Sequence, residues 1–208
     1  GDLHGLEVVF MPRHGSGHTI PPHQVNYRAN VWAMRDAGIQ TVVGMTAVGG
    51  ISDPMEPGTL CVPDQLIDYT YGRQQTFFDD ELSPVTHVDF TEPYCQRLRE
   101  GLIQAAHDHQ VPVHTSGTYG VTQGPRLETA MEVQRLARDG CDLVGMTGMP
   151  EAALARELDL CYANLSLVVN WAAGLGAGPI TMHEIERHLN DGMERAVQVI
   201  SSVKLSST

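Results

Sequence analysis

The chain has 208 residues, of which 42% are hydrophobic and 18% charged, so it can bury a sizeable core and carries too little charge for a disordered chain. Its 13 Lys and Arg against 25 Asp and Glu give a formal charge of -12, which argues against nucleic acids and anionic membranes as partners. No apolar run approaches the ~18 residues of a membrane span, and the first residues do not resemble a signal peptide, so we expect a cytoplasmic location.

Short apolar, β-branched runs alternate with longer amphipathic segments. Near-continuously apolar strands separated by helices are typical of an α/β fold, so we predict one domain with a mixed central β-sheet, which could be barrel-like, flanked by helices. Strands are predicted at residues 6–11, 41–46, 60–67, 118–122, 143–146 and 161–169. Helices are predicted at residues 23–37, 92–109, 127–138, 150–158 and 182–203.

The four cysteines form no CxxC pair and no metal-finger spacing. We therefore expect reduced thiols, with disulfides as the alternative. The residues concerned are Cys61, Cys95, Cys141 and Cys161.

In α/β sheets, ligands bind where loops leave the carboxyl ends of the strands. The first such loop, MPRHGSGHTIPPHQVNY, contains the Arg13 guanidinium and the titratable His14, which suit a phosphate oxyanion. The alternatives are a solvated loop and a metal site of His14, His18 and His23. No carboxylate accompanies these histidines at ligand spacing, so we predict no metal.

Two further sets of residues follow predicted strands. In MTAVGG, Thr46 offers a hydroxyl and the N–H groups from Ala47 onward can form an anion-binding nest, although a tight turn is the alternative. In TQGPRLE, GMTGMPE and NLSLVVNWAAG, one polar residue each follows an apolar run: Glu128, Thr147 and Asn170. Each has a structural alternative as a first-turn acid, an N-cap or a turn residue. Together they would line an apolar cleft of the kind that binds small molecules.

These segments together resemble the trimeric purine nucleoside phosphorylase and methylthioadenosine phosphorylase family. The matching motifs are PRHGSGHTIPPHQVNYRANVWAM, MTAVGGI, DQLIDYT, GTYGVTQGPRLET and VGMTGMPEAALARE, in family order from about Val8 to Ile185. The resemblance implies a nucleoside phosphorylase-like α/β fold, a homotrimer, and cleavage of a purine nucleoside by inorganic phosphate as co-substrate, without a metal or organic cofactor. It assigns phosphate binding to Arg13, His14, Thr46, Ala47 and Thr147, and contact with the ribose to Met146.

The resemblance also implies which base is bound. Members that take 6-aminopurines carry an Asp at the end of the LVV-type strand and another two residues later, where this chain has Asn170 and Ala172. The 6-oxopurine members carry the Asn together with a Glu that matches Glu128. A carboxylate can accept from the N1–H of such a base, and an amide oxygen can accept from N7–H. We therefore expect a hypoxanthine-like base and catalytic roles for Asn170, Glu128 and His14. Leu127 replaces the family's aromatic residue at the base.

At the sugar end, members that bind a free 5'-hydroxyl carry a histidine in the last helix. Met182 and Ile185 stand there in this chain, and His183 is displaced by one position. His87 matches a histidine that a neighbouring subunit contributes. The resemblance therefore implies 5'-methylthioinosine as the substrate, with hypoxanthine and 5-methylthioribose 1-phosphate as products.

The family's first strand and Gly-rich phosphate loop would precede Gly1, so we expect one phosphorylase domain over residues 1–208 that lacks them. Two alternatives stay open: a 6-oxopurine nucleoside phosphorylase that uses inosine or guanosine, and a non-catalytic purine-binding protein. A serine hydrolase is disfavoured because the sequence contains no GxSxG motif.

Overall fold

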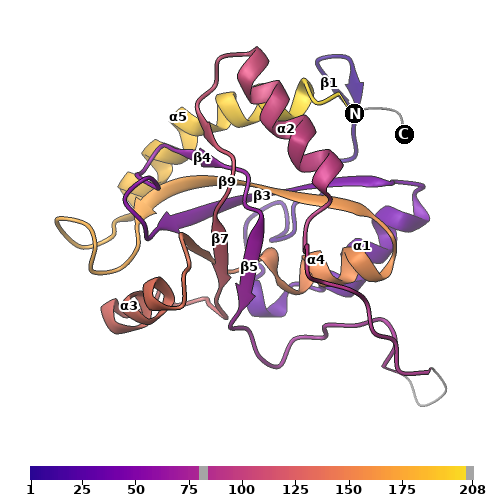
Figure 1. Cartoon of the computed structure of the whole chain (residues 1–208), viewed down its shortest axis with the longest axis horizontal. Helices are drawn as coiled ribbons and strands as arrows, with labels where there is room; N and C mark the ends of the chain where they lie inside the picture. Colours follow the sequence, from indigo (N-terminus) through magenta and orange to yellow (C-terminus); the bar gives the residue numbers. More distant parts are fainter. Residues whose placement is uncertain (80–83, 205–208) are drawn as a thin grey trace.

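The computed structural model describes residues 1–79 and 84–204, in which strands and helices surround one strongly twisted sheet (Figure 1). The strands are β1 (Asp2–Leu3), β2 (Leu6–Glu7), β3 (Thr41–Gly50), β4 (Leu60–Cys61), β5 (Gln65–Asp68), β6 (Val113–His114), β7 (Thr118–Val121), β8 (Leu143–Gly145) and β9 (Cys161–Trp171). The helices are α1 (Tyr27–Asp36), α2 (Gln96–Asp108), α3 (Ala130–Arg138), α4 (Gly148–Glu157) and α5 (Met182–Ser201), with a 3-10 turn at Pro22–Gln24.

The main sheet has the strand order β5-β7-β8-β3-β9-β4-β6, and β1 and β2 form a separate hairpin. Strands β5, β7 and β8 are parallel to one another, whereas β3 is antiparallel to β8 and parallel to β9. The predicted mixed central sheet of an α/β fold is therefore confirmed. Its long strands β3 and β9 hold the two halves of the sheet together.

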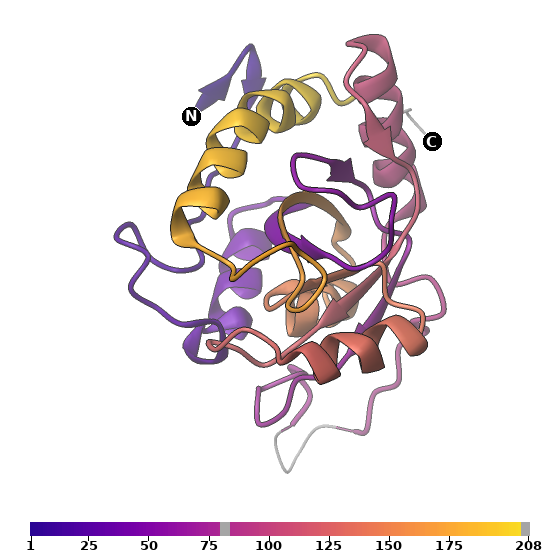
Figure 2. The same cartoon turned by 90° about the vertical axis from the view of Figure 1, so that its left-hand side faces the viewer.

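Helices cover both faces of the sheet (Figures 1 and 2). Helices α2 and α5 pack on one face, where Leu98, Leu102 and Ala196 meet Leu165 and Leu167 of β9 in one buried cluster. Helices α1 and α4 pack on the opposite face, and α3 covers a third, smaller cluster beside β8. The apolar character of β9 on both faces follows from this arrangement.

Side-chain caps determine where the helices begin. Helix α3 starts later than predicted because Thr129 accepts the N–H of Glu132 while the Glu132 carboxylate accepts the N–H of Thr129, a capping box. Helix α1 likewise starts after Asn26, whose side chain accepts the N–H of Ala29. Helix α3 ends where predicted, before Gly140, which has a left-handed φ of 93°.

Two predicted strands are wrong in extent. Residues 8–11 join no strand, and Phe10 is 84% exposed, because these residues face no ladder partner within the described chain. The predicted strand at residues 60–67 is two strands, β4 paired with β9 and β5 paired with β7. Pro63 lies between them and lacks the N–H that a continuous ladder needs.

The expectation of four reduced thiols is also wrong, because Cys95 and Cys161 form a disulfide while Cys61 and Cys141 are free and buried. The bond joins the start of α2 to the start of β9. The same two segments are also linked by a hydrogen bond, in which the Cys95 N–H donates to the Tyr162 carbonyl at 2.7 Å. The sequence rule failed because it weighed spacing along the chain, and these cysteines are 66 residues apart.

We expect the disulfide to stabilise the fold. A cross-link across 66 residues removes conformational entropy from the unfolded chain, worth about 4 kcal/mol in the chain-entropy description. The Cys95→Ser/Cys161→Ser double variant should lose a free energy of unfolding of this order in urea titrations. Treatment of the wild type with a reductant should give the same loss, and treatment of the double variant should give none. Equal stability of wild type and double variant would contradict this expectation.

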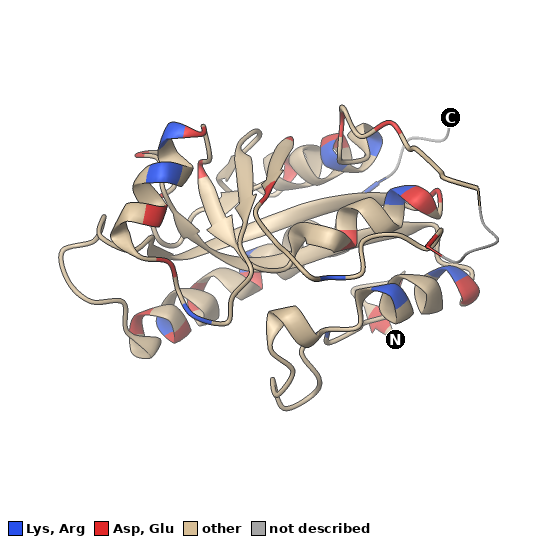
Figure 3. Cartoon of the chain, turned by 90° about the horizontal axis from the view of Figure 1, so that it is seen from below, with Lys and Arg blue, Asp and Glu red and all other residues tan. Residues whose placement is uncertain are grey.

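Charged residues lie mainly on helices and loops, and the strands carry few (Figure 3). Two charged residues among those described are buried, Arg99 of α2 at 7% and Glu151 of α4 at 4% exposure. Arg99 is satisfied by main-chain carbonyls, including those of Pro63 and Thr115, and braces the bend between β4 and β5. Among the described residues, no helix is long and apolar enough to cross a membrane.

Candidate active site

The pairing of β3 with its two neighbours brings the predicted segments together. Gly49 of β3 lies opposite Asn170 of β9 and also pairs with β8. Because β8 is antiparallel to β3, the chain that leaves β8 at Met146 runs back beside β3 toward Thr46. Strand β7 flanks β8 on its other side, and the N–H of Thr122, just after β7, donates to the last carbonyl of β8 at 2.8 Å. The residues that follow β7 and β8 therefore lie together, whereas β9 ends level with the start of β8. The loop after β9 approaches the start of α3, where Gly174 lies against the side chain of Ala130.

Arg13 is held in this region by a buried carboxylate. Its Nε and Nη2 donate to the two carboxylate oxygens of Glu151 at 2.9 Å each, and its Nη1 donates to the carbonyl of Met45 in β3 at 2.9 Å. Glu151 also accepts from the hydroxyl of Tyr162 at 2.8 Å. Burial alone would lower the pKa of Arg13, but the charge and hydrogen bonds of Glu151 raise that pKa. Three of the five guanidinium N–H groups are used, so two are left for an anion.

His14 is oriented by the main chain of its own loop. Its Nδ1 lies 2.8 Å from the carbonyl oxygen of Ile20, and since a carbonyl only accepts, Nδ1 carries the proton. Nε2 is therefore the nitrogen that can face a ligand. The His18 ring lies 4.6 Å away, centroid to centroid. Burial, partly offset by the Ile20 hydrogen bond, lowers the pKa of His14.

The lowered pKa of His14 predicts a pH effect on stability. The folded chain binds fewer protons at this residue than the unfolded chain, so the contribution of neutral His14 is complete above pH 6.5 and is lost as the pH falls toward the lowered value. We expect wild type to lose more free energy of unfolding than His14→Asn on going from pH 8 to pH 5. Urea denaturation at both values measures the difference, and equal losses would contradict it. Asn is the matched replacement because its amide can still donate to Ile20.

Thr46 and Ala47 lie within β3 and not in a loop after it. Strand β3 continues to Gly50 beside β9, with a bulge between Val48 and Gly49, so the prediction of a strand that ends at Thr46 and is followed by an N–H nest is wrong. The Thr46 hydroxyl is buried and lies 3.0 Å from Ser166 Oγ and 3.2 Å from Asn164 Oδ1. Ala47 is exposed. Its N–H points to the same edge of β3 as the Met45 carbonyl that Arg13 binds, because alternate residues of a strand share an edge.

Thr147 and Met146 occupy the turn from β8 into α4. Thr147 has the N-cap position of α4, yet its buried side chain makes no cap hydrogen bond, so the structural alternative of a capping hydroxyl is not realised. Met149 has a non-helical φ of -122° and ψ of 140°, so the regular part of α4 begins at Pro150, beyond Thr147. Met146 packs against Gly124, where a φ of 60° and the close approach of the Met146 sulfur leave no room for a Cβ.

Glu128 and Asn170 each have free hydrogen-bonding capacity. Glu128 Oε1 accepts from the hydroxyl of Thr122 at 2.6 Å, which leaves its second oxygen as an acceptor. Asn170 Nδ2 donates to the carbonyl of Trp171 at 2.7 Å, an interaction that fixes the orientation of the amide. Its Oδ1 accepts from no group in the described residues. Both side chains are half-buried, as groups at the edge of a binding cleft would be.

The remaining predicted residues have different surroundings. Ala172 lies close to Asn170, because a Cβ added to Gly49 would contact both residues. Ala172 is 2% exposed and belongs to the core cluster under α3. Met182 is exposed on the first turn of α5, and Ile185 packs toward the core between α2, α5 and β9. Leu127 and His87 are exposed on loops.

The structure adds residues that the sequence did not single out: Glu151, Tyr162 and Thr122, which hold predicted site residues, and Arg73, described below. Glu151 belongs to the GMTGMPE motif, which is the one signal that could have found it. Its partner Arg13 lies 138 residues earlier, a separation that no local pattern bridges.

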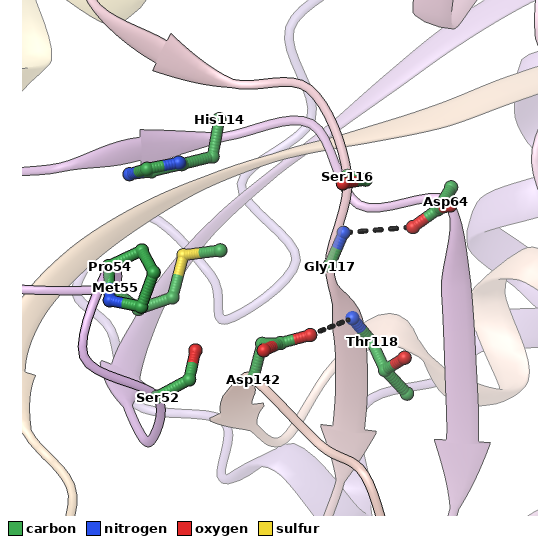
Figure 4. Close-up of a pocket in the computed structure, with 9 residues that line it drawn as sticks. All are labelled: Ser52, Pro54, Met55, Asp64, His114, Ser116, Gly117, Thr118 and Asp142. Atoms are coloured by element: carbon green, nitrogen blue, oxygen red, sulfur yellow. Dashed lines mark hydrogen bonds between the residues drawn. The ribbon is translucent and has the colours of Figure 1, made fainter.

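A cavity of about 300 Å³ lies elsewhere, at the opposite ends of β7 and β8 (Figure 4). Its two carboxylates bind the main chain at the start of β7, since Asp64 accepts the N–H of Gly117 at 2.8 Å and Asp142 accepts that of Thr118 at 2.9 Å. None of the predicted site residues lines it. The lining residues are Ser52, Pro54, Met55, Asp64, His114, Ser116, Gly117, Thr118 and Asp142.

Known proteins share both the sequence and the fold. The model of the family described as the Phosphorylase superfamily matches residues 1–204. A protein of Pseudomonas syringae named probable S-methyl-5'-thioinosine phosphorylase is 55% identical over 207 residues, which cover 100% of this chain and 84% of that protein. The 6-oxopurine nucleoside phosphorylase of Pyrococcus furiosus is 47% identical, over 93% of this chain and 75% of that protein.

A solved structure agrees with these relatives. Methylthioadenosine phosphorylase from Schistosoma mansoni in complex with adenine superposes with a TM-score of 0.93 at 32% identity, over 97% of this chain and 77% of that chain. The chain therefore belongs to the phosphorylase superfamily, and its sheet and helices have the nucleoside phosphorylase fold.

Proposed function

We propose that the protein is a pentosyltransferase that cleaves S-methyl-5'-thioinosine with phosphate, giving hypoxanthine and 5-methylthioribose 1-phosphate. The observation that carries the proposal is a pair of acceptors with no donor among the described residues, Glu128 Oε2 in the loop after β7 and Asn170 Oδ1 near the end of β9. A 6-oxopurine presents N1–H as a donor, and N7–H as a second donor when it leaves protonated. Relatives that are 53–57% identical and named probable S-methyl-5'-thioinosine phosphorylases support this reading.

Phosphate binds, in this proposal, to the positively charged side of the site. Arg13 supplies its two remaining N–H groups, and Glu151 keeps the guanidinium in place. Thr147 supplies its hydroxyl, which makes no cap hydrogen bond to α4. Neutral His14 accepts, at Nε2, a hydrogen bond from the O–H of a monohydrogen phosphate. Ala47 supplies its main-chain N–H to the phosphate. Thr46 supports this part of β3 through the hydrogen bonds of its hydroxyl to Asn164 and Ser166.

The chemistry then depends on charge placement and needs no covalent enzyme intermediate. As the C1'–N9 bond lengthens, positive charge develops on the sugar and the bound phosphate oxyanion stabilises it. The purine leaves with the electron pair of the broken bond and takes up a proton at N7 from solvent water. Asn170 Oδ1 accepts a hydrogen bond from that N–H, and Glu128 accepts one from N1–H. Met146 lies under the ribose, and Leu127 lies beside the base. Ala172 stands where 6-aminopurine enzymes have an aspartate, and its small side chain leaves space beside the base. Phosphate is the only co-substrate in this proposal.

A substrate panel tests the proposal. Methylthioinosine, methylthioadenosine, inosine, guanosine and adenosine are each incubated with and without phosphate, and the released base is quantified by chromatography. We expect phosphate-dependent release of hypoxanthine, fastest from methylthioinosine. Faster reaction of either adenine nucleoside would overturn the base assignment. Binding of hypoxanthine without turnover under any condition would instead support a non-catalytic purine-binding protein.

One specific observation favours a second candidate, a phosphorylase of inosine or guanosine. Relatives from Pyrococcus furiosus and Thermococcus kodakarensis, each 47% identical, are named 6-oxopurine nucleoside phosphorylases, the second as probable. The two candidates share the base contacts and differ at the 5' position of the sugar. Met182 and Ile185 are apolar and suit a thioether better than a hydroxyl, so we favour the methylthio substrate.

We further propose that the protein works in the cytoplasm as a homotrimer in which His87 completes a neighbour's sugar pocket. His87 lies on an exposed stretch beside the exposed apolar Val85 and Val88, which fits a surface covered by another subunit. Analytical ultracentrifugation tests the assembly. A trimer is expected at micromolar concentration, and a strictly monomeric, active species would contradict the role of His87.

A further inference from the structure

Arg73 connects four parts of the chain around the proposed nucleoside site. It lies in the loop after β5, and its guanidinium makes six hydrogen bonds at 2.6–3.3 Å. Nε donates to the side chain of Gln123, and Nη2 donates to the carbonyls of Thr122 and Gln123. Nη1 donates to the carbonyls of Met146 and Met149 and to the Tyr27 hydroxyl.

The partners of Arg73 belong to the two loops that carry the proposed substrate contacts. Thr122 holds Glu128, which faces the base, and Met146 precedes Thr147, which faces phosphate and sugar. None of the hydrogen-bond acceptors of Arg73 in the described chain is a carboxylate. The charge is therefore satisfied by main-chain dipoles, and by the face of the Tyr27 ring, whose centroid lies 5.5 Å from Cζ.

Only a planar fork with donors on several sides can reach both loops at once. A lysine ammonium in the same place has three donors on one atom and can hold one loop but not the other. The carbonyls of Met146 and Gln123 would then no longer accept hydrogen bonds from the same side chain. A shift of the loops by a fraction of an ångström would change the distances to base and sugar together.

Resting on the function proposed above, we infer that Arg73 is a positioning residue, which sets the distance between the base-binding loop after β7 and the sugar-binding loop after β8. It touches neither substrate nor phosphate. Arg13 and His14, which bind phosphate, are not among its contacts. Loss of the fork should therefore affect the nucleoside more than phosphate.

The test compares Arg73→Lys with Arg138→Lys, a matched replacement at an exposed position near the end of α3. For Arg73→Lys we expect kcat/KM for methylthioinosine to fall about 10²-fold, the effect of ångström-scale misplacement. The KM for phosphate should change much less. Backbone hydrogen exchange should accelerate at residues 122–123 and 146–149 together, and Arg138→Lys should resemble wild type in all three measurements.

The outcomes separate the inference from the proposed function. A purely structural role would lower the free energy of unfolding while leaving the nucleoside KM and local exchange of the folded protein unchanged, and this result would overturn the inference. Unchanged exchange at either loop would overturn it as well, whether or not the protein turns over a nucleoside. An inactive wild type with accelerated exchange in Arg73→Lys would instead refute the proposed function and keep the positioning role.

Discussion

Replacing Arg13 by Met should both destabilise the fold and abolish efficient use of phosphate. The side chain of Glu151 is 5% exposed and that of Arg13 is 18% exposed, so removing the guanidinium leaves a buried carboxylate without its counter-charge. Loss of one partner of a buried ion pair costs about 3 kcal/mol or more. The KM for phosphate should rise about 10²-fold, the scale of losing charge-assisted hydrogen bonds. Urea denaturation and phosphate titrations of initial rates measure the two effects.

A second variant separates the two effects. Arg13→Met with Glu151→Gln removes the unpaired charge and keeps an acceptor for the Tyr162 hydroxyl. We expect this double variant to regain most of the lost stability and none of the phosphate affinity. Recovery of phosphate affinity along with stability would show that Arg13 acts only on the fold, contrary to its proposed role as an anion ligand.

Replacing Asn170 by Ala should lower kcat for methylthioinosine about 10²-fold, the effect of removing one hydrogen bond that forms as charge develops in the transition state. The unfolding free energy should change little, because the half-buried side chain makes one hydrogen bond, to the carbonyl of Trp171. Single-turnover kinetics at saturating phosphate isolates the bond-breaking step. A kcat equal to that of wild type would exclude a role for Asn170 at N7.

Asn170→Asp is the matched variant because it changes the group without changing its size. A carboxylate in place of the amide loses the donor to Trp171 and favours a base that donates from both N7 and a 6-amino group. We expect the ratio of kcat/KM for methylthioadenosine to that for methylthioinosine to rise about tenfold, equivalent to one hydrogen bond. A fall in that ratio would contradict the donor and acceptor assignment.

The sequence predicts the layered α/β architecture well because it is a property of local patterns. The apolar runs of β3, β7, β8 and β9 and the amphipathic helices between them give the alternation directly. The sequence offers Glu128, Thr147 and Asn170 as candidates because each is a polar residue that follows an apolar run. In the described residues Glu128 Oε2 and Asn170 Oδ1 have no donor, and their contacts with a base stay a prediction.

Features that depend on distant partners were not predictable in this way. The sequence predicts that β3 ends at Thr46, because small residues after a strand usually indicate a turn. In the structure β8 and β9 both pair with Gly49 and Gly50, and this pairing keeps them in the sheet. The Cys95–Cys161 bond depends on where α2 begins relative to β9. The role of Arg73 is not visible in the sequence, because its six hydrogen bonds go to other segments of the chain.

The central claim is that Glu128 and Asn170 read the same purine as a 6-oxo base. A crystal structure of the protein with hypoxanthine and phosphate bound tests it most directly. We predict a carboxylate oxygen of Glu128 within hydrogen-bond distance of N1, Asn170 Oδ1 within hydrogen-bond distance of N7, and phosphate on Arg13. Hypoxanthine bound with either side chain turned away from the ring, or in the cavity beside Asp64 and Asp142, would contradict the account.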